Sequence, residues 1–131
     1  MLFEKIEIEN SDTIAKARSR LGTGLLTVID DSQPIVPAVR NIMEFFARES
    51  CGWCRPCRDG LPWSAQVLDD IEKGRGRPED MDTLARQVAF IGAIGNTHCA
   101  LAPGAMEPLQ SAMKYFREDF ERHINGGACP F

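Results

Sequence analysis

Apolar side chains recur every three or four positions along most of the chain, which is the spacing of one face of an α-helix. Four segments show this pattern, and polar or glycine-rich stretches separate them. The residues that we expect to face the core are, segment by segment, Val39, Ile42, Met43 and Phe46; Trp63, Val67, Leu68 and Ile71; Met81, Leu84, Val88 and Ile91; and Leu109, Met113, Phe116 and Phe120. The pattern therefore predicts a mainly α fold, a small four-helix bundle.

Start and stop signals set the limits of these helices. Pro62 suits the first turn of the second helix, with Asp59 as its cap, and residues 74–76 (Gly-Arg-Gly) end it. The third helix is expected to start at Pro78, because the acidic residues of its first turn suit the helix dipole. The fourth is predicted as one helix over about residues 104–124.

The N-terminal segment, residues 1–33, has a different pattern. Residues 12–21 predict a short helix, and Leu25–Ile29 predicts a strand that polar residues end. Phe3, Ile6 and Ile8 also suggest a short extended piece near the N-terminus. Because two short strands do not make a stable sheet alone, we expect this segment to lean on the helices or to be the edge of a neighbouring domain. The expected organisation is a short N-terminal extended or β segment, a helical domain over residues 34–124 and a flexible tail over residues 125–131.

Composition narrows the function classes. Of the 131 residues, 44% are hydrophobic and 26% are charged, the balance of a soluble domain, and a net charge of −4 without a basic stripe argues against nucleic acid as a partner. The longest uncharged stretch, residues 87–106, is interrupted by Asn96 and Pro103, so it predicts a helix followed by a loop rather than a membrane span. Glu4 and Lys5 are not followed by an apolar run, so we expect no secretion signal and a cytoplasmic location.

Five cysteines in such a chain favour metal or redox chemistry over a disulfide scaffold. Three of them, Cys51, Cys54 and Cys57, lie in one seven-residue segment, and Cys99 follows after forty-one further residues. Thiolates are the ligands that iron–sulfur clusters select, and a cubane offers four iron corners. Two-residue gaps let one loop present three sulfurs to the cluster. The fourth corner needs a ligand from elsewhere in the fold, and Cys99 is the candidate.

Zinc is the main alternative for these four cysteines. A four-cysteine zinc site usually takes two ligands from each of two separate two-cysteine turns. Here three of the ligands lie in one loop and only one lies beyond it. The spacing therefore favours one [4Fe-4S] cluster over zinc, with disulfide chemistry a distant third, and an electron-transfer domain as its setting.

Several residues near the cysteines have two interpretations. Arg55 and Arg58 either place positive charge beside a negatively charged cluster or are solvated residues that pair with Glu49. Trp53 either shields the cluster from water or fills the core. His98 is interpreted as a partly exposed loop residue in preference to a hydrogen-bond donor to a sulfur.

The remaining polar groups are interpreted as structural. His123 is expected near a helix C-terminus, where its partial charge suits the dipole. The acidic stretches at residues 69–72 and 118–121 are expected to be solvated helix faces. No nucleophile–base set is present, so hydrolytic catalysis has no support.

A longer signature surrounds the cysteines, and it runs Glu-Ser-Cys-Gly-Trp-Cys-Arg-Pro-Cys-Arg-Asp-Gly over residues 49–60. It resembles the signature of the flavin-carrying, NADH-oxidising F-type subunit of respiratory complex I, in proteobacterial sequences most of all. The likeness covers most of residues 11–124. The stretches that carry it are residues 18–24, 49–64, 74–80, 99–100, 103–112 and 114–117.

The resemblance implies a function for the cysteines. In the family, the residues that correspond to Cys51, Cys54, Cys57 and Cys99 hold the [4Fe-4S] cluster, which takes electrons from reduced flavin and passes them to further iron–sulfur centres. The resemblance also implies a helical bundle preceded by a ubiquitin-like β-domain, of which residues 1–33 look like the last remnant. The implied partners are a flavin- and NADH-binding domain or subunit and other iron–sulfur subunits, on the cytoplasmic side of a membrane-bound complex.

The departures from the family limit what is carried over. Residues 22–24 (Gly-Thr-Gly) lack the third glycine and the strand–helix setting of a dinucleotide-binding fingerprint, so we expect no FMN or NAD on this chain and no activity by the chain alone. Diaphorase subunits of NAD-linked hydrogenases and formate dehydrogenases share the cysteine signature and remain an alternative, as does a docking domain that a metal stabilises without redox chemistry. Cys129 is interpreted as a plain thiol on the tail, although it also resembles the opening of a further ferredoxin-like domain.

Overall fold

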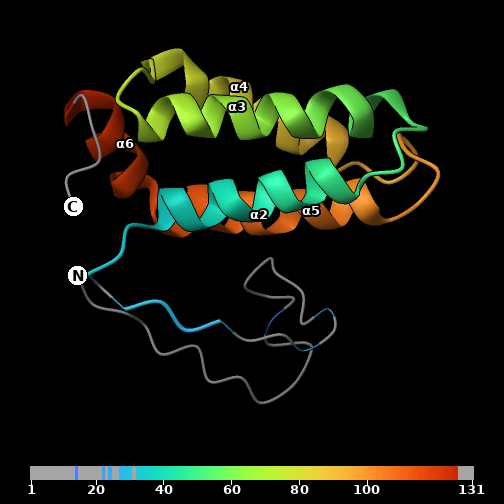
Figure 1. The fold of residues 1–131 in the computed structure, drawn as a ribbon, viewed down its shortest axis with the longest axis horizontal. Coiled ribbons are helices and arrows are strands. Elements are labelled where there is room, and N and C mark those ends of the chain that lie inside the picture. Colours follow the sequence, from blue (N-terminus) through green and yellow to red (C-terminus); the bar gives the residue numbers. More distant parts are fainter. Residues whose placement is uncertain (1–13, 15–21, 23, 25–26, 31, 127–131) are drawn as a thin grey trace.

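The computed structural model describes residues 14, 22, 24, 27–30 and 32–126. The described part is mainly helical and contains no strand, so the predicted mainly α fold is confirmed (Figure 1). Its elements are α2 (Ile35–Glu49), the π-helical turn η1 (Pro56–Gly60), α3 (Leu61–Glu72), α4 (Pro78–Ile91), α5 (Leu101–Tyr115) and α6 (Arg117–Gly126).

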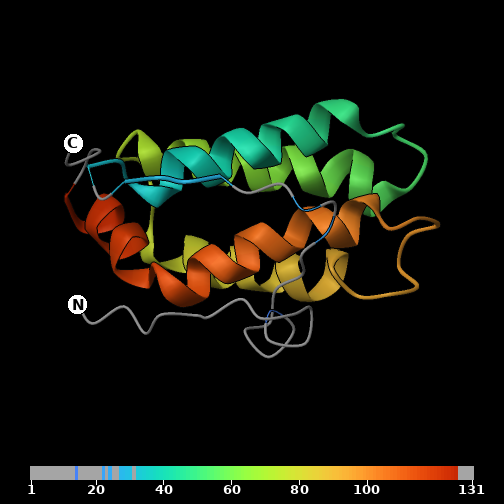
Figure 2. The same ribbon diagram turned by 90° about the horizontal axis from the view of Figure 1, so that it is seen from below.

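The four longer helices run up and down as a bundle, and α6 crosses one end of it (Figure 1). Helix α2 packs against α3 and α5, and α4 packs against α5 and α3. As a result, the α2–α3 connection and the α4–α5 connection lie at the same end of the bundle, as both views show (Figures 1 and 2). The bundle thereby places residues 51–57 beside residues 92–100, which are far apart in sequence.

The bundle core is formed by one face of each helix, largely as the hydrophobic spacing predicts. Two expectations are wrong, since Trp63 is 51% exposed and Ile42 is 37% exposed. Val88 and Phe46 are half-buried and pack on the edge of the core. The largest apolar side chains with almost no exposed surface are Met43, Leu61, Leu68, Ile71, Leu84, Ile91, Met106, Leu109 and Phe120.

Helix starts follow local hydrogen bonding. Helix α4 begins at Pro78 as predicted, and the carboxylate of Asp80 accepts the backbone N–H of Arg77 at 2.7 Å. Helix α3 begins one residue before Pro62, directly from η1 and without a side-chain cap. The capping role predicted for Asp59 is wrong, because its carboxylate pairs with Arg58 at 3.3 Å instead.

The C-terminal part is two helices where the sequence predicts one. Helix α5 ends at Tyr115, Phe116 leaves the helical conformation with φ −123°, and α6 starts at Arg117. The break turns α6 across the end of the bundle, where Phe120 and His123 are fully buried. His123 lies in the last turn of α6, near the helix C-terminus as predicted, and its Nδ1 lies 2.7 Å from the backbone oxygen of Asp119.

An ion-pair network joins α2 to α3. Arg40 of α2 contacts Glu44 at 3.2 Å on its own helix and Asp69 at 3.2 Å on α3, and Lys73 donates to Asp69 at 2.7 Å. The hydrogen bond from Lys73, with the charge of Arg40 adding to it, lowers the pKa of Asp69 below its ordinary value of 3.8. The acidic stretch at residues 69–72 therefore serves helix packing and is not merely a solvated face.

Part of the N-terminal prediction falls outside the described residues. Only Ile14 of the helix expected at residues 12–21 is described, and it is helical and buried. The part of the expected strand that is described, residues 27–29, is not in a strand; Leu25 and Leu26 lie outside the described residues, as do the extended piece expected at residues 3–8 and Cys129. Within the described residues, every helix is too short or too polar to cross a membrane.

Candidate metal centre

The first cysteine loop, residues 51–57, starts where α2 ends at Glu49. Directly after Cys51, Gly52 has φ +71°, a left-handed conformation that glycine adopts without strain. The backbone oxygen of Cys54 accepts the N–H groups of Cys57 at 3.1 Å and Arg58 at 2.8 Å. These two bonds close a tight turn that keeps Cys54 and Cys57 together.

Cys57 lies inside the π-helical turn η1, which the sequence pattern does not indicate. π-helical turns are rare and often found at functional sites. Cys57 is 5% exposed, whereas Cys51 is exposed and Cys54 is half-buried. Gly60 lets the turn approach α4 closely, since a Cβ atom there would lie 2.5 Å from Cδ1 of Ile91. The turn therefore fixes one of the cysteine sulfurs in the bundle core.

The second loop, residues 92–100, brings the fourth cysteine to the same end of the bundle. The backbone N–H of His98 donates to Sγ of Cys54 at 3.4 Å, which ties the two loops together although 44 positions separate these residues. Thr97 donates its hydroxyl to the backbone oxygen of Cys99 at 2.9 Å and shapes the chain around that cysteine. His98 is an exposed loop residue, as the preferred interpretation predicts. A hydrogen bond to a sulfur is also present, but the backbone N–H of His98 makes it.

In the described part of the chain, cysteine sulfurs accept two hydrogen bonds. Besides the bond from His98, the hydroxyl of Ser50 donates to Sγ of Cys57 at 3.1 Å. Within the described residues, no three cysteine, histidine or acidic side chains lie close enough together to hold a single metal ion. The structure thus brings the two cysteine loops together without forming a closed single-ion site.

The charges around the loops are paired differently from the expectation. Asp59 contacts Arg55 at 3.8 Å and Arg58 at 3.3 Å, and Glu49 pairs with Arg48 at 3.3 Å. Arg58 also reaches the backbone oxygen of Gly52 at 3.5 Å, so its guanidinium lies over the first cysteine loop. The pairing with Glu49, which is one of the interpretations of Arg55 and Arg58, is therefore wrong.

Two helices start at the cysteine end, which adds partial positive charge there. The continuous helical segment of η1 and α3 starts at Pro56, next to Cys57, and α5 starts at Leu101, two residues after Cys99. Unpaired N–H groups at a helix start favour a negatively charged group nearby. The cysteine end is therefore electrostatically suited to an anionic centre.

Large aromatic side chains near these loops are exposed to solvent. Trp53 is 79% exposed, so it does not fill the core, and Trp63 and Phe90 are 51% and 59% exposed. Trp63, Phe90 and Arg55 line a shallow hollow of about 610 Å³ next to η1. Exposed apolar surface of this kind is typical of contact sites.

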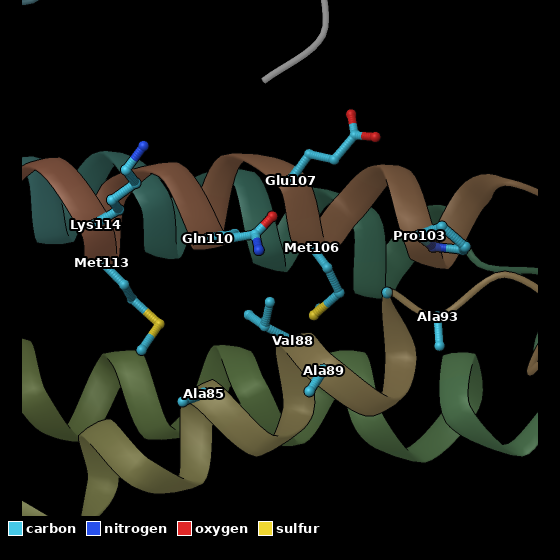
Figure 3. Close-up of a pocket in the computed structure, with 11 residues that line it drawn as sticks. Ala85, Val88, Ala89, Ala93, Pro103, Met106, Glu107, Gln110, Met113 and Lys114 are labelled. Atoms are coloured by element: carbon cyan, nitrogen blue, oxygen red, sulfur yellow. The ribbon is translucent and has the colours of Figure 1, made fainter. Parts of the chain in front are cut away.

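A second hollow, of about 590 Å³, runs between α4 and α5 (Figure 3). Its sides are Ala85, Val88 and Ala89 on α4 and Met106 and Met113 on α5. The side chains of Glu107 and Lys114 point away from the space between the two helices in Figure 3. The lining also includes Gln110, Glu107 and Lys114, but among the described residues it holds no group of cysteine, histidine and acidic side chains that could bind a metal ion. The cysteine end is therefore the candidate site.

A comparison with protein families finds a match over residues 37–123 to the NADH-ubiquinone oxidoreductase-F iron-sulfur binding region. The F subunit of NADH-quinone oxidoreductase from Escherichia coli (strain K12) is 58% identical over 113 residues, which are 86% of this chain and 25% of that protein. The F subunit from Streptomyces coelicolor is 46% identical over 118 residues, 90% of this chain and 26% of that protein. The chain therefore spans about a quarter of the length of these relatives.

A solved structure with a similar fold is that of an NAD+-reducing [NiFe]-hydrogenase. In the H2-reduced state the TM-score is 0.66 with 29% sequence identity, over 79% of this chain and 17% of the hydrogenase chain. In the air-oxidised state the TM-score is 0.69 over 74% of this chain, again with 29% identity and 17% of the hydrogenase chain. The likeness confirms the helical fold, and both relatives and structure belong to NAD-linked redox proteins by name.

Proposed function

This chain belongs to the family of the NADH-ubiquinone oxidoreductase-F iron-sulfur binding region, and we propose that it is an electron-transfer module that accepts electrons from reduced flavin and passes them to further iron–sulfur centres. The family match indicates a [4Fe-4S] cluster as its cofactor. Such a cluster supplies one-electron chemistry when it is bound by thiolates.

The residues at the cysteine end fit this cofactor. Thiolates are its preferred ligands, and we propose that they come from Cys51, Cys54, Cys57 and Cys99. The observation that carries the assignment is the hydrogen bond from the N–H of His98 to Sγ of Cys54, because it holds the loop of Cys99 against the loop with the other three cysteines. The helix starts and Arg58 next to the loops suit the negative charge of the centre.

The partners follow from the relatives, which are subunits of NADH-quinone oxidoreductases. We propose that a flavin- and NADH-binding domain or subunit delivers electrons to this chain and that another iron–sulfur subunit receives them, in the cytoplasm or on the cytoplasmic side of a membrane-bound complex. The exposed Trp53, Trp63 and Phe90 beside the cysteine loops support a partner surface at this end.

A diaphorase subunit of an NAD-linked hydrogenase is the second setting. The fold likeness to the hydrogenase chain supports it, at 29% identity. The 58% identity to the Escherichia coli F subunit favours the NADH-quinone oxidoreductase setting instead. The proposed role of the chain, one-electron transfer through its cluster, is the same in both.

Anaerobic reconstitution of the full chain with iron and sulfide tests the proposed function. We expect about four irons per chain and a broad brown visible absorption band that dithionite bleaches reversibly. A colourless chain that binds zinc and shows no reversible couple would instead identify a metal-stabilised docking domain. Wild-type chain reconstituted with zinc alone is the matched control, because it separates folding from redox chemistry.

A further inference from the structure

The side chain of Ser50 donates a hydrogen bond to a cysteine sulfur. Its Oγ lies 3.1 Å from Sγ of Cys57. We propose that Ser50 is a tuning and positioning residue of the cluster, whose hydroxyl keeps the reduction potential higher than the thiolates alone would set it. The proposal rests on the proposed function, since it takes Cys57 as a cluster ligand.

The direction of the hydrogen bond follows from the other contact of Ser50. Its Oγ accepts the backbone N–H of Gly52 at 3.1 Å, which occupies a lone pair and leaves the hydroxyl hydrogen for the sulfur. A metal-bound thiolate has no hydrogen of its own and only accepts hydrogen bonds. With Cys57 ligated, Ser50 is therefore the donor.

The bond is held by rigid parts of the fold. Ser50 is the residue that caps the C-terminus of α2, and Cys57 lies in η1 among core side chains with 5% of its surface exposed. Water has little access to replace a lost donor at this sulfur, and low local polarity strengthens the bond. The donor to the other sulfur, on Cys54, is a backbone N–H, which side-chain substitution does not remove.

The hydrogen bond stabilises one redox state more than the other. A donor that points at a ligand sulfur interacts more strongly when the centre carries an additional electron, because charge-assisted hydrogen bonds are the stronger ones. Removing the hydroxyl is therefore expected to lower the equilibrium constant for one-electron reduction by about five- to tenfold, where tenfold corresponds to ~59 mV.

The test compares four full-length chains, each reconstituted anaerobically: wild type, Ser50→Ala, Ser50→Thr and Ser64→Ala. The midpoint potential is measured by titration with mediators, followed by visible absorption and electron paramagnetic resonance, and iron is counted in parallel. Ser50→Thr keeps the hydroxyl. Ser64→Ala is the matched control, because it removes a buried serine hydroxyl that bonds the backbone oxygen of Gly60 at 2.9 Å and touches no sulfur.

The expected result is a lower potential in Ser50→Ala, with wild-type potentials in Ser50→Thr and Ser64→Ala. If Ser50→Ala does not retain iron, retention by Ser50→Thr at the wild-type potential supports the proposal equally. It is overturned if Ser50→Ala holds the cluster with the equilibrium constant changed less than about 1.5-fold (~10 mV), or if Ser50→Thr shifts like Ser50→Ala or fails to hold the cluster. A wild-type chain without any reversible couple refutes the proposed function itself, which distinguishes the two failures.

Discussion

The backbone N–H of His98 donates to the sulfur of Cys54 at 3.4 Å and joins two loops that are separated in the sequence by the whole of α3 and α4. The contact exists because α3 and α4 run down and back along the bundle, which returns the chain to the end where α2 stops (Figure 1). A ligand set that spans both loops therefore depends on the bundle being folded.

Replacing the cysteine of the second loop tests that dependence. Cys99→Ser is expected to lose or degrade the cluster, because it removes one of the four proposed thiolate corners. Cys129→Ser should leave the iron content at about four per chain, since we interpret Cys129 as a plain thiol. Iron and sulfide analysis after anaerobic reconstitution measures both, and full iron retention by Cys99→Ser would remove Cys99 from the ligand set.

Arg58 offers a test of charge near the cluster. Its guanidinium lies 3.5 Å from the backbone oxygen of Gly52 and pairs with Asp59. Because reduction adds negative charge to the centre, reversing this positive charge in Arg58→Glu should lower the midpoint potential by ~30 mV, which is about 0.7 kcal/mol for one electron. The side chain is about half exposed, so the shift should shrink at high ionic strength.

The control for this prediction is Arg117→Glu on α6, which makes the same change of charge at the opposite end of the bundle (Figure 1). Its potential should stay at the wild-type value. An Arg58→Glu potential that stays constant or rises, measured by titration with the iron content intact, would show that Arg58 is only a solvated surface residue.

The sequence predicts the helices better than their ends. Spacing locates the core because burial selects apolar residues once per helical turn, and Leu68, Leu84 and Leu109 are fully buried as expected. It misses the break at Phe116, since Phe116 and Phe120 continue the same apolar spacing whether the helix runs on or turns. It also misplaces Trp63, whose hydrophobicity is compatible with a core or with an exposed contact surface.

The candidate site was predictable in chemistry but not in detail. Cysteine spacing and the resemblance name the proposed ligands, because both depend on residue type and order alone. The π-helical turn that buries Cys57 and the bond from Ser50 to its sulfur depend on tertiary packing against α4, which leaves no periodic signal in the sequence. In the sequence, the only sign of this hydrogen bond is that Ser50 directly precedes Cys51. The contact of its hydroxyl with the sulfur of Cys57 becomes visible only in the structure.

The chain is expected to neither retain flavin nor oxidise NADH by itself. It spans about a quarter of its F-subunit relatives, 25% of the Escherichia coli protein, and residues 22–24 lack a complete dinucleotide-binding fingerprint. Absorption spectra after gentle purification and an NADH oxidation assay with an artificial acceptor check this. Stoichiometric flavin, or turnover by the reconstituted chain, would contradict it.

Asp69→Asn should destabilise the junction of α2 and α3. The substitution weakens the contacts to Lys73 at 2.7 Å and Arg40 at 3.2 Å, at a cost of about 1 kcal/mol, or roughly 3–5 °C in Tm. The pKa of Asp69 is lowered from 3.8 in the folded chain, so its contribution is complete above that value and is lost only as the pH falls below it.

The difference in Tm between wild type and Asp69→Asn should therefore be the same at about pH 7 and about pH 5. Thermal unfolding followed by far-UV circular dichroism measures it. Glu44→Gln is the control. Glu44 contacts Arg40 at 3.2 Å, but its side chain is 44% exposed, so this substitution should lower the Tm less than Asp69→Asn does. A Tm difference that disappears by pH 5 would contradict the lowered pKa of Asp69.

Phe120 and Trp63 are both large aromatic residues, but they differ in burial and should differ in their contribution to stability. Phe120 of α6 is fully buried at the end of the bundle, whereas Trp63 of α3 is 51% exposed beside the first cysteine loop. Phe120→Ala should lower the free energy of unfolding by about 3–5 kcal/mol, because it removes a buried ring and leaves a cavity, while Trp63→Ala should cost less than about 1.5 kcal/mol. Urea unfolding of the two variants compares them directly. Because Trp63 is the larger side chain, hydrophobicity alone predicts the reverse order, and finding that order would mean that α6 does not close the bundle as the structure has it.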